Sequence, residues 1–241
     1  MKNVIVISAH PDDEILGAGG TLLKHKSKGD NLAWVIVTSM TEEQGFSKEK
    51  ITEREKEIKK VSQMVGFSNV YRLNYPVVTL NSDSMNDMVP EISSIFLEFK
   101  PEVIYVMNRS DAHSDHRYTF NSVMSCTKSF RYPFIKKIFM YECISETEFS
   151  PALNENVFIP NYFVNISDQI KRKIAEYACS EKIITTAAKY LKVFPTLNRI
   201  EVYHNIPITP EKARGAMKWH RDDFGYKSLD LFIAITDIDD Q

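Results

Sequence analysis

Short apolar runs alternate with longer amphipathic segments from residue 4 to about residue 130. The runs are unbroken and rich in β-branched residues, a pattern typical of parallel strands that are covered on both faces. Such alternation is typical of sheets whose strands are joined by right-handed helical crossovers. We therefore predict a single-domain α/β fold with a doubly wound, mostly parallel, Rossmann-like sheet flanked by helices. The predicted strands of this part are Val4–Ser8, Leu32–Thr38, Asn69–Leu73 and Val103–Met107.

The segments between these runs carry apolar residues at helical spacing, and each is followed by a glycine or a proline. We predict helices over Leu16–Lys28, Ser47–Val65 and Met85–Phe99. Beyond residue 130 the periodic pattern is weaker. There we predict strands over Ile135–Cys143, Val157–Ile166 and Leu229–Thr236, and helices over Asp168–Ser180, Ile183–Val193 and Pro210–Trp219.

The composition is that of an ordinary globular protein, with 43% hydrophobic and 26% charged residues. The formal net charge is only -2, so electrostatics give no reason to expect nucleic acid or an anionic membrane surface as a partner. Three widely spaced cysteines argue against a disulfide framework or a thiolate metal site. We expect neither a transmembrane segment nor a signal peptide. We expect a cytoplasmic protein, and the sequence leaves open whether it forms a homo-oligomer.

The first predicted strand ends in the stretch AHPDDE, which places His10 beside Asp12, Asp13 and Glu14. In an open α/β sheet, ligands bind outside the carboxyl ends of the strands, so this stretch lies where a site is expected. Imidazole nitrogens and carboxylate oxygens are ordinary zinc ligands, and His10 and Asp13 could both reach one ion. Adjacent side chains of an extended segment point to opposite sides, so Asp12 and Asp13 are expected to have different roles.

Structural roles compete with this interpretation. The acids could stabilise the N-terminus of the following helix, although that would explain one acid rather than three beside a histidine. Taken alone, His10 could equally be a hydrogen-bonded core histidine. Gly17, Gly19 and Gly20 do not fit a dinucleotide-binding loop, and we expect them to allow close contact between helix and sheet. His25 lies later in the same predicted helix, and we expect it on the outer, solvated side.

A catalytic zinc usually has three protein ligands and one open position, so a further histidine is expected at the end of another strand. The strand Val103–Met107 is followed by NRSDAHSDHR, which places Asp111, His113, Asp115 and His116 within six positions. Two such clusters, each directly after a buried parallel strand, can converge on one crevice. We interpret His116 as the third ligand, His113 as a free proton donor and Asp115 as a residue that orients an imidazole.

AHPDDE and DAHSDHR, in this order and on this predicted fold, resemble the motifs of the PIG-L/LmbE family of metal-dependent N-acetyl-sugar deacetylases. Two further stretches are similar to family segments: VTSMTEEQG to Thr-x-Gly-Glu-x-Gly, and TEREKEIKKVSQMVGFSNVYRLNYP to an Arg-x-x-Glu helix followed by a short strand. The resemblance covers about residues 2–130. It implies a Zn²⁺-dependent hydrolase, with Fe²⁺ or another divalent metal as an alternative. Its small-molecule substrate would be an N-acetylglucosamine-type sugar or a conjugate, from which it removes the acetyl group.

The resemblance also implies roles at matching positions of this sequence. His10, Asp13 and His116 would be the metal ligands. Asp12 would be the general base that activates water at the metal. His113 would act as the acid or stabilise the oxyanion.

Asp115 would support one of the histidines, and Arg54 matches the helix arginine that contacts substrate in family members. An ion-paired surface helix would explain Arg54 as well. Ser114 stands where the family usually has proline, and this change removes no ligand. Val77 and Val78 stand where the family has an acidic residue after Tyr-Pro, so this chain lacks that acidic group.

The second half of the chain departs from the family. We expect one deacetylase domain over residues 1–241, with residues 1–130 as its well-matched core. Residues 131–241 diverge, and we expect them to determine the choice of substrate and to include a C-terminal extension. Only RIEVYH, residues 199–204, is similar to a later family segment, Ala-Glu-Ala-Phe.

Three other functions could use these residues. A metal-dependent amidase with the same fold could act on another amide, such as that of a thiol conjugate, and a substrate panel would separate the two. A sugar- or metal-binding protein without turnover would need the ligands but neither Asp12 nor His113. An iron oxygenase also uses two histidines and one carboxylate, but it would need a site for a cosubstrate.

Overall fold

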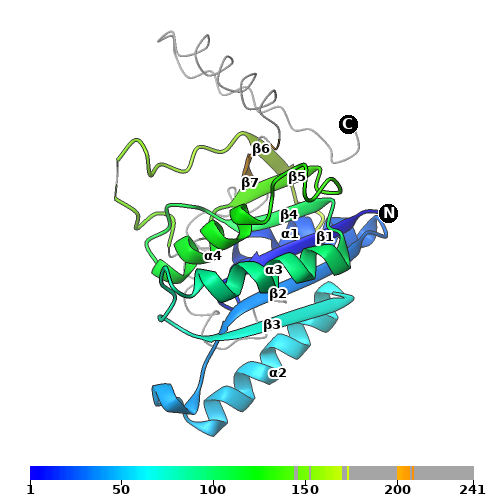
Figure 1. Cartoon of the computed structure of the whole chain (residues 1–241). Helices are drawn as coiled ribbons and strands as arrows, with labels where there is room; N and C mark the ends of the chain where they lie inside the picture. The colour runs from blue at the N-terminus through cyan, green and yellow to red at the C-terminus, as the bar shows by residue number, and fades with distance from the viewer. Residues whose placement is uncertain (144–145, 152, 170–172, 174–199, 207, 209–241) are drawn as a thin grey trace.

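A computed structural model describes residues 1–143, 146–151, 153–169, 173, 200–206 and 208 of the chain (Figure 1). These residues form one seven-stranded sheet with helices on both faces. The strands are β1 Asn3–Ser8, β2 Asn31–Ser39, β3 Asn69–Pro76, β4 Val103–Met107, β5 Lys137–Tyr141, β6 Tyr162–Asn165 and β7 Ile200–Asn205. The helices are α1 Asp13–Ser27, α2 Lys48–Val65, α3 Met85–Phe99 and α4 Ser114–Ser125, with a 3-10 turn at Glu42–Gln44.

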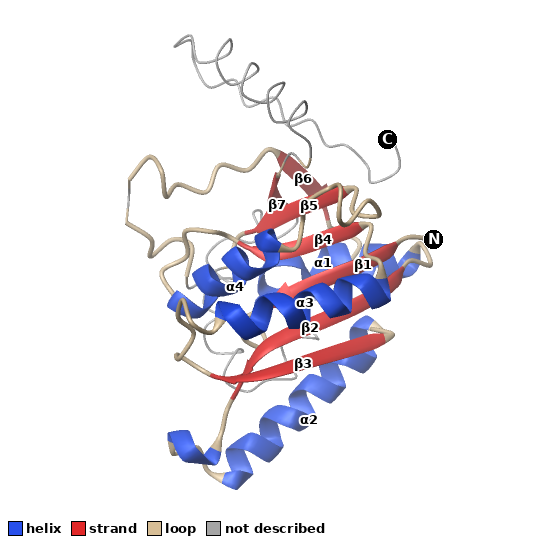
Figure 2. Ribbon diagram, in the orientation of Figure 1, coloured by secondary structure: helices blue, strands red, loops and turns tan. Residues whose placement is uncertain are grey.

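The strand order is β3-β2-β1-β4-β5-β7-β6. All pairings from β3 to β5 are parallel, whereas β7 is antiparallel to both β5 and β6. Figure 2 shows α3 and α4 in front of the sheet and α1 behind it. The predicted doubly wound, mostly parallel sheet is therefore confirmed. The strand order reverses between β1 and β4, which is where such folds open a crevice at the carboxyl ends of their strands.

Burial on both faces explains why the central strands are uninterrupted apolar runs. Val4 to Ile7 of β1 and Leu32 to Val37 of β2 are fully buried, and β4 is buried throughout. Each large apolar side chain removed from water in this way contributes about 1.5–3 kcal/mol. The Trp34 indole donates to the Ser8 hydroxyl at 2.6 Å, so the polar atoms at the end of β1 are also paired.

Local signals explain the ends of α2 and α3. The Ser47 hydroxyl accepts from the N–H of Lys50 at the start of α2, and Gly66 ends it in the left-handed conformation, with φ of 82°. α3 ends at Phe99, and Lys100 follows in the left-handed conformation directly before Pro101, which cannot continue the helix. Both helices lie where the sequence predicts them.

Gly17 and Gly20 allow α1 to lie close to the structure around it. A Cβ atom at Gly17 would collide with the Tyr141 ring and the Glu142 carbonyl, and one at Gly20 would collide with Ile166. The expectation that these glycines serve close packing is confirmed. α1 begins at Asp13, within the AHPDDE stretch that follows β1.

The part after β4 differs from the prediction. The segment Val157–Ile166 forms a strand only over Tyr162–Asn165, because Val157 and Ile159 are exposed and Pro160 lacks an N–H for a ladder. We did not predict β7, which lies between β5 and β6. Its six residues become a strand through pairing with segments that are distant along the chain.

The expectation of a solvated His25 is wrong. Its side chain is 2% exposed, and it lies between Asp30 and Tyr105. α1 packs on the centre of the sheet, so β4 covers this part of the helix with the ring of Tyr105. His25, a polar residue of the predicted helix, therefore lies on the face of α1 that packs against the sheet.

Several predictions lie outside the described residues: the helices over 183–193 and 210–219, most of the helix over 168–180, and the strand over 229–236. Within the described part, none of the helices is both long enough and apolar enough to cross a membrane. Cys126 and Cys143 are both buried in the interior.

Candidate metal centre

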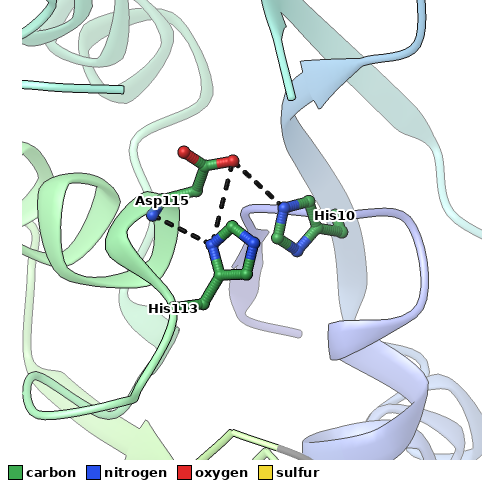
Figure 3. Close-up of side chains that lie close together, drawn as sticks. All are labelled: His10, His113 and Asp115. Carbon is green, nitrogen blue, oxygen red and sulfur yellow. Dashed lines mark hydrogen bonds and ion pairs between the residues drawn. The ribbon is translucent and has the colours of Figure 1, made fainter. Parts of the chain in front are cut away.

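Two loops meet where the neighbouring strands β1 and β4 end. β1 runs into the AHPDDE loop, and β4 runs into the loop that carries His113 before α4. The first loop turns tightly, because the N–H groups of Asp12 and Asp13 both donate to the His10 carbonyl, at 2.9 and 3.4 Å. Figure 3 shows His10 from the first loop facing His113, which precedes α4, and Asp115, which lies in the first turn of α4.

Three side chains converge on one point: His10 from the first loop, Asp13 from the start of α1 and His116 from the first turn of α4. Nε2 of His116 lies 3.4 Å from Nδ1 of His10 and 3.4 Å from Oδ1 of Asp13. Oδ2 of Asp13 lies 3.9 Å from Nδ1 of His10, and one ligand atom from each residue lies within 4.8 Å of the others. The structure therefore brings together the three residues that the sequence predicts as metal ligands.

In His10 and in His116, the ring nitrogen that does not face the other ligands contacts a carboxylate. Nδ1 of His116 lies 2.9 Å from Asp111, and Nε2 of His10 lies 3.2 Å from Asp115. A carboxylate accepts, so these two nitrogens carry the protons. In the neutral imidazoles this leaves His116 Nε2 and His10 Nδ1 as the unprotonated nitrogens near Asp13, an arrangement that fits a cation held by carboxylate-oriented histidines. The sequence reasoning assigned no role to Asp111.

His10, His113 and Asp115 form a second group with ligand atoms close enough for one ion. The Asp115 carboxylate is already engaged, because it accepts from two backbone N–H groups of the β3–α3 loop at 2.7 and 3.2 Å. Nδ1 of His113 accepts from the N–H of Asp115 at 3.1 Å (Figure 3). The group of His10, Asp13 and His116 therefore fits a metal better. Asp115 supports His10.

Charge around the three ligands favours a cation. Burial alone would lower the pKa of His116, but the charge of Asp13 and the hydrogen bond to Asp111 raise this pKa well above its usual value. Burial would raise the pKa of Asp13, but His116 and His10 lower it far below its usual value. A divalent cation would supply the positive charge that these groups favour.

Asp12 and His113 line a pocket of about 330 Å³ beside the three ligands. Burial, and then the charge of Asp13, raises the pKa of Asp12 above its usual value. Burial, and then the charge of His10, lowers the pKa of His113. Because Nδ1 of His113 accepts from the backbone, the neutral ring carries its proton on Nε2. The pocket thus pairs a carboxylate that can take up a proton with an imidazole N–H.

Arg54 reaches this pocket from α2. Its Nη1 donates to the Pro11 carbonyl at 3.4 Å, and its Nε lies 3.4 Å from Glu57. Val77 and Val78 also line this pocket, and their side chains are apolar. Arg54 is therefore one of the residues that line this pocket.

Glu14, the third acid of the first motif, does not line the pocket. It is fully buried on α1, and burial is the main reason that its pKa lies well above its usual value. The three consecutive acids therefore have three environments. Asp12 lies in the pocket, Asp13 lies among the ligands and Glu14 lies in the interior.

The model of the PIG-L family, described as GlcNAc-PI de-N-acetylase, matches residues 5–127, just over half of the 241 residues. The matched part contains both histidine–aspartate motifs. The chain belongs to the PIG-L family. The resemblance stated from the motifs is therefore confirmed.

Two proteins of similar sequence are described as deacetylases, which is consistent with this family. YaiS of Escherichia coli K12, described as an uncharacterized deacetylase, is 27% identical over 178 residues, 71% of this chain and 91% of YaiS. The diacetylchitobiose deacetylase of Thermococcus kodakarensis is 22% identical over 181 residues, 72% of this chain and 67% of that protein. The N,N'-diacetylchitobiose deacetylase structure from Pyrococcus horikoshii matches with a TM-score of 0.64 at 20% identity, covering 86% of this chain and 84% of that chain. This structural match shows the PIG-L fold.

The sequence reasoning missed the segment that follows β5. The Cys143 thiol donates to Oδ1 of Asp13 at 3.3 Å, and the Thr147 hydroxyl donates to Asp111 at 2.8 Å. Glu146 lies between them and lines the pocket. Because β5 is the neighbour of β4, the rule that sites lie at the carboxyl ends of strands could have pointed to this segment.

Proposed function

We propose that this PIG-L protein is a metal-dependent N-deacetylase that hydrolyses the acetamido group of an N-acetylglucosamine-type sugar or its conjugate. The observation that carries the proposal is the convergence of two oriented imidazoles and one carboxylate beside a pocket that holds Asp12 and His113. The deacetylases YaiS and diacetylchitobiose deacetylase, similar over about 70% of this chain, support it.

His10, Asp13 and His116 would hold the metal. Two imidazole nitrogens and one carboxylate oxygen fit Zn²⁺ with an open position, and the same set accepts Fe²⁺ or another divalent ion. When bound, the metal would supply Lewis acidity toward the acetamide oxygen and toward water. Asp111 and Asp115 would keep the two imidazoles in the tautomers that ligation needs.

Asp12 is the base in this mechanism. Its raised pKa brings the carboxylate closer to the pKa that suits a general base near neutral pH. It takes a proton from water as the water oxygen forms a bond to the acetamide carbon. It then gives the proton to the nitrogen as the carbon–nitrogen bond breaks, which releases acetate and the amine.

His113 stabilises the negative charge that develops on the acetamide oxygen. Its neutral ring offers the Nε2 hydrogen, because Nδ1 is occupied by the backbone N–H of Asp115. Arg54 lies on the α2 side of the pocket, and we propose that it binds the substrate. The volume of about 330 Å³ is sufficient for one sugar ring rather than a long glycan.

We propose one deacetylase domain over residues 1–241, in which residues 131–241 determine the choice of sugar conjugate. The pocket gives this a physical basis, because Glu146 lines it from beyond the region that the family model matches.

The test is acetate release from a panel of N-acetylglucosamine compounds by purified protein, with added Zn²⁺, with Fe²⁺ and after chelation. The panel includes N-acyl thiol conjugates. Metal-dependent acetate from a sugar supports the proposal. Hydrolysis of the thiol conjugates alone would make the protein an amidase of another kind. A protein with bound metal that hydrolyses no compound of the panel would contradict the proposed reaction.

A further inference from the structure

Glu146 lies in the pocket, and the proposed mechanism does not use it. It follows β5, lines the same pocket as Asp12 and His113, and is partly buried. His10, one of the proposed metal ligands, lines the same pocket, so Glu146 belongs to the surroundings of the proposed metal site. It is not part of either group of potential metal ligands among the described residues.

The backbone around Glu146 is attached to the site. Its carbonyl accepts from the N–H of Ala112 at 3.1 Å, and Ala112 directly precedes His113. Its own N–H donates to the Cys143 carbonyl at 3.1 Å. The adjacent Thr147 donates to Asp111. Glu146 is therefore held against the loop that carries the second motif.

Within the described residues, no side chain or backbone group donates a hydrogen bond to the Glu146 carboxylate. Glu55, another carboxylate of the pocket, has partners, because it accepts two hydrogen bonds of 2.9 Å from Arg72. Burial is the main reason that the pKa of Glu146 is raised. A partly desolvated carboxylate without a donor is unfavourable, and a ligand that brings a donor would relieve this.

We propose that Glu146 is a specificity-determining residue that accepts a hydrogen bond from the 3-hydroxyl group of the amino sugar. This inference rests on the proposed function, which places the 2-acetamido group between Asp12 and His113. Only C1 and C3 flank that position, and in a conjugate the C1 oxygen carries no proton. A carboxylate that lines the same pocket therefore meets the 3-hydroxyl as the nearest donor of the ring. The proposal predicts poor turnover of sugars that lack this hydroxyl or carry an anionic substituent on it.

The experiment is a cycle of enzyme and substrate changes with the full-length, metal-loaded protein. The substrate is the best compound of the acetate-release panel, and the altered substrate is its 3-deoxy analogue. In the wild type, loss of the 3-hydroxyl should lower kcat/KM about 10- to 100-fold. Glu146→Ala should cause a similar loss on the parent substrate and little further loss on the 3-deoxy analogue. Glu146→Gln, which keeps an acceptor oxygen, should recover part of the activity.

Metal content and thermal midpoint are measured for every variant, so that a folding or metal defect is recognised. Glu148→Gln, two residues further on and exposed, is the matched control and should behave as the wild type. If the losses from Glu146→Ala and from the 3-deoxy substrate multiply, or if Glu146→Ala loses its metal, the inference is wrong while acetate release stands.

Calorimetric binding of the amine product needs no turnover and separates the two proposals. Glu146→Ala should weaken binding of the amine with a 3-hydroxyl, and should leave binding of the 3-deoxy amine unchanged. A wild type that neither releases acetate from any sugar nor binds any of the amines would overturn both the proposed function and this inference.

Discussion

The described part of the chain contains two buried clusters of histidine and aspartate, one near each end of α1. At its start, Oδ1 of Asp13 lies 3.4 Å from Nε2 of His116, and the same nitrogen lies 3.4 Å from Nδ1 of His10. Near its end, His25 lies 2.7 Å from Asp30 through Nδ1 and 3.0 Å from the Tyr105 hydroxyl through Nε2. The two histidines are equally buried and each has an aspartate partner.

The difference lies in the ring nitrogens that remain for a ligand. Both nitrogens of His25 have protein partners, so this cluster ties α1 to β4 and to the turn before β2. His116 uses only Nδ1 for support by Asp111, and its Nε2 is directed toward His10 and Asp13. A histidine close to an aspartate therefore indicates a site only when the second nitrogen is directed to other ligand atoms.

The largest effect is expected for His116→Ala. It removes one of the three proposed ligands, so bound metal should be lost and acetate release should fall by more than about 10,000-fold, beyond the usual contribution of a general base. Elemental analysis and acetate release measure the two effects. His25→Ala is the control from the other cluster, and it should keep its metal. Equal metal content in His116→Ala and the wild type would show that His116 is not a metal ligand and that the two clusters do not differ in this way.

Asp12→Ala should lower kcat by about 100- to 10,000-fold, because the proton acceptor is lost while the ligands stay in place. Metal content should remain that of the wild type. Steady-state kinetics with elemental analysis test this. A variant with normal turnover would show that Asp12 is not the base.

Asp111→Asn should weaken metal affinity about 10- to 100-fold, because it disturbs the tautomer and orientation of His116. Competition with a chelator measures the affinity. Asp30→Asn makes the same change beside His25, and it should leave the metal affinity unchanged. Similar metal loss in both variants would mean that the effect is general destabilisation.

His25→Phe and Tyr105→Phe each leave a buried polar partner without its hydrogen bond. We expect each to lower the free energy of unfolding by about 1–3 kcal/mol, with kcat/KM unchanged at temperatures where the protein stays folded. Urea unfolding and acetate release measure the two quantities. A large loss of activity in a folded variant would give the second cluster a functional role.

The smallest effect concerns acid stability. The hydrogen bond from His25 lowers the pKa of Asp30 below 3.8, although burial opposes it. This carboxylate therefore stabilises the fold above about pH 4, and its contribution is lost as the pH falls below the unfolded value of about 3.9 and through the folded one. The urea midpoint measured between pH 3 and 6 should fall less steeply in Asp30→Asn than in the wild type. Equal slopes would contradict the predicted linkage.

Much of the fold could be predicted from the sequence, because its signals are local. Continuous apolar runs identify β1, β2 and β4 as buried parallel strands. Gly66 marks the end of α2, and Pro101 marks the end of α3. The ends of β1 and β4 carry His10, Asp13 and His116, and the general rule for open α/β sheets brings such ends together. The sequence therefore predicts the candidate ligands.

The remaining parts depend on contacts between segments that are far apart along the chain. β7 is a strand because it pairs between β5 and β6, and the Glu201 carboxylate on it accepts from the N–H groups of Gly20 and Thr21 in α1. His25 is buried because Tyr105 of β4 covers it. No local pattern encodes either contact.

The sequence by itself determined which segments form the parallel strands and which motif follows each of them, since both are local patterns. Only the tertiary structure decided which atoms have partners. It directs one nitrogen of His116 to other ligand atoms, satisfies both nitrogens of His25, and brings Glu146 into the pocket. The physical reason is that a hydrogen bond depends on distance and direction, which only the packed chain defines.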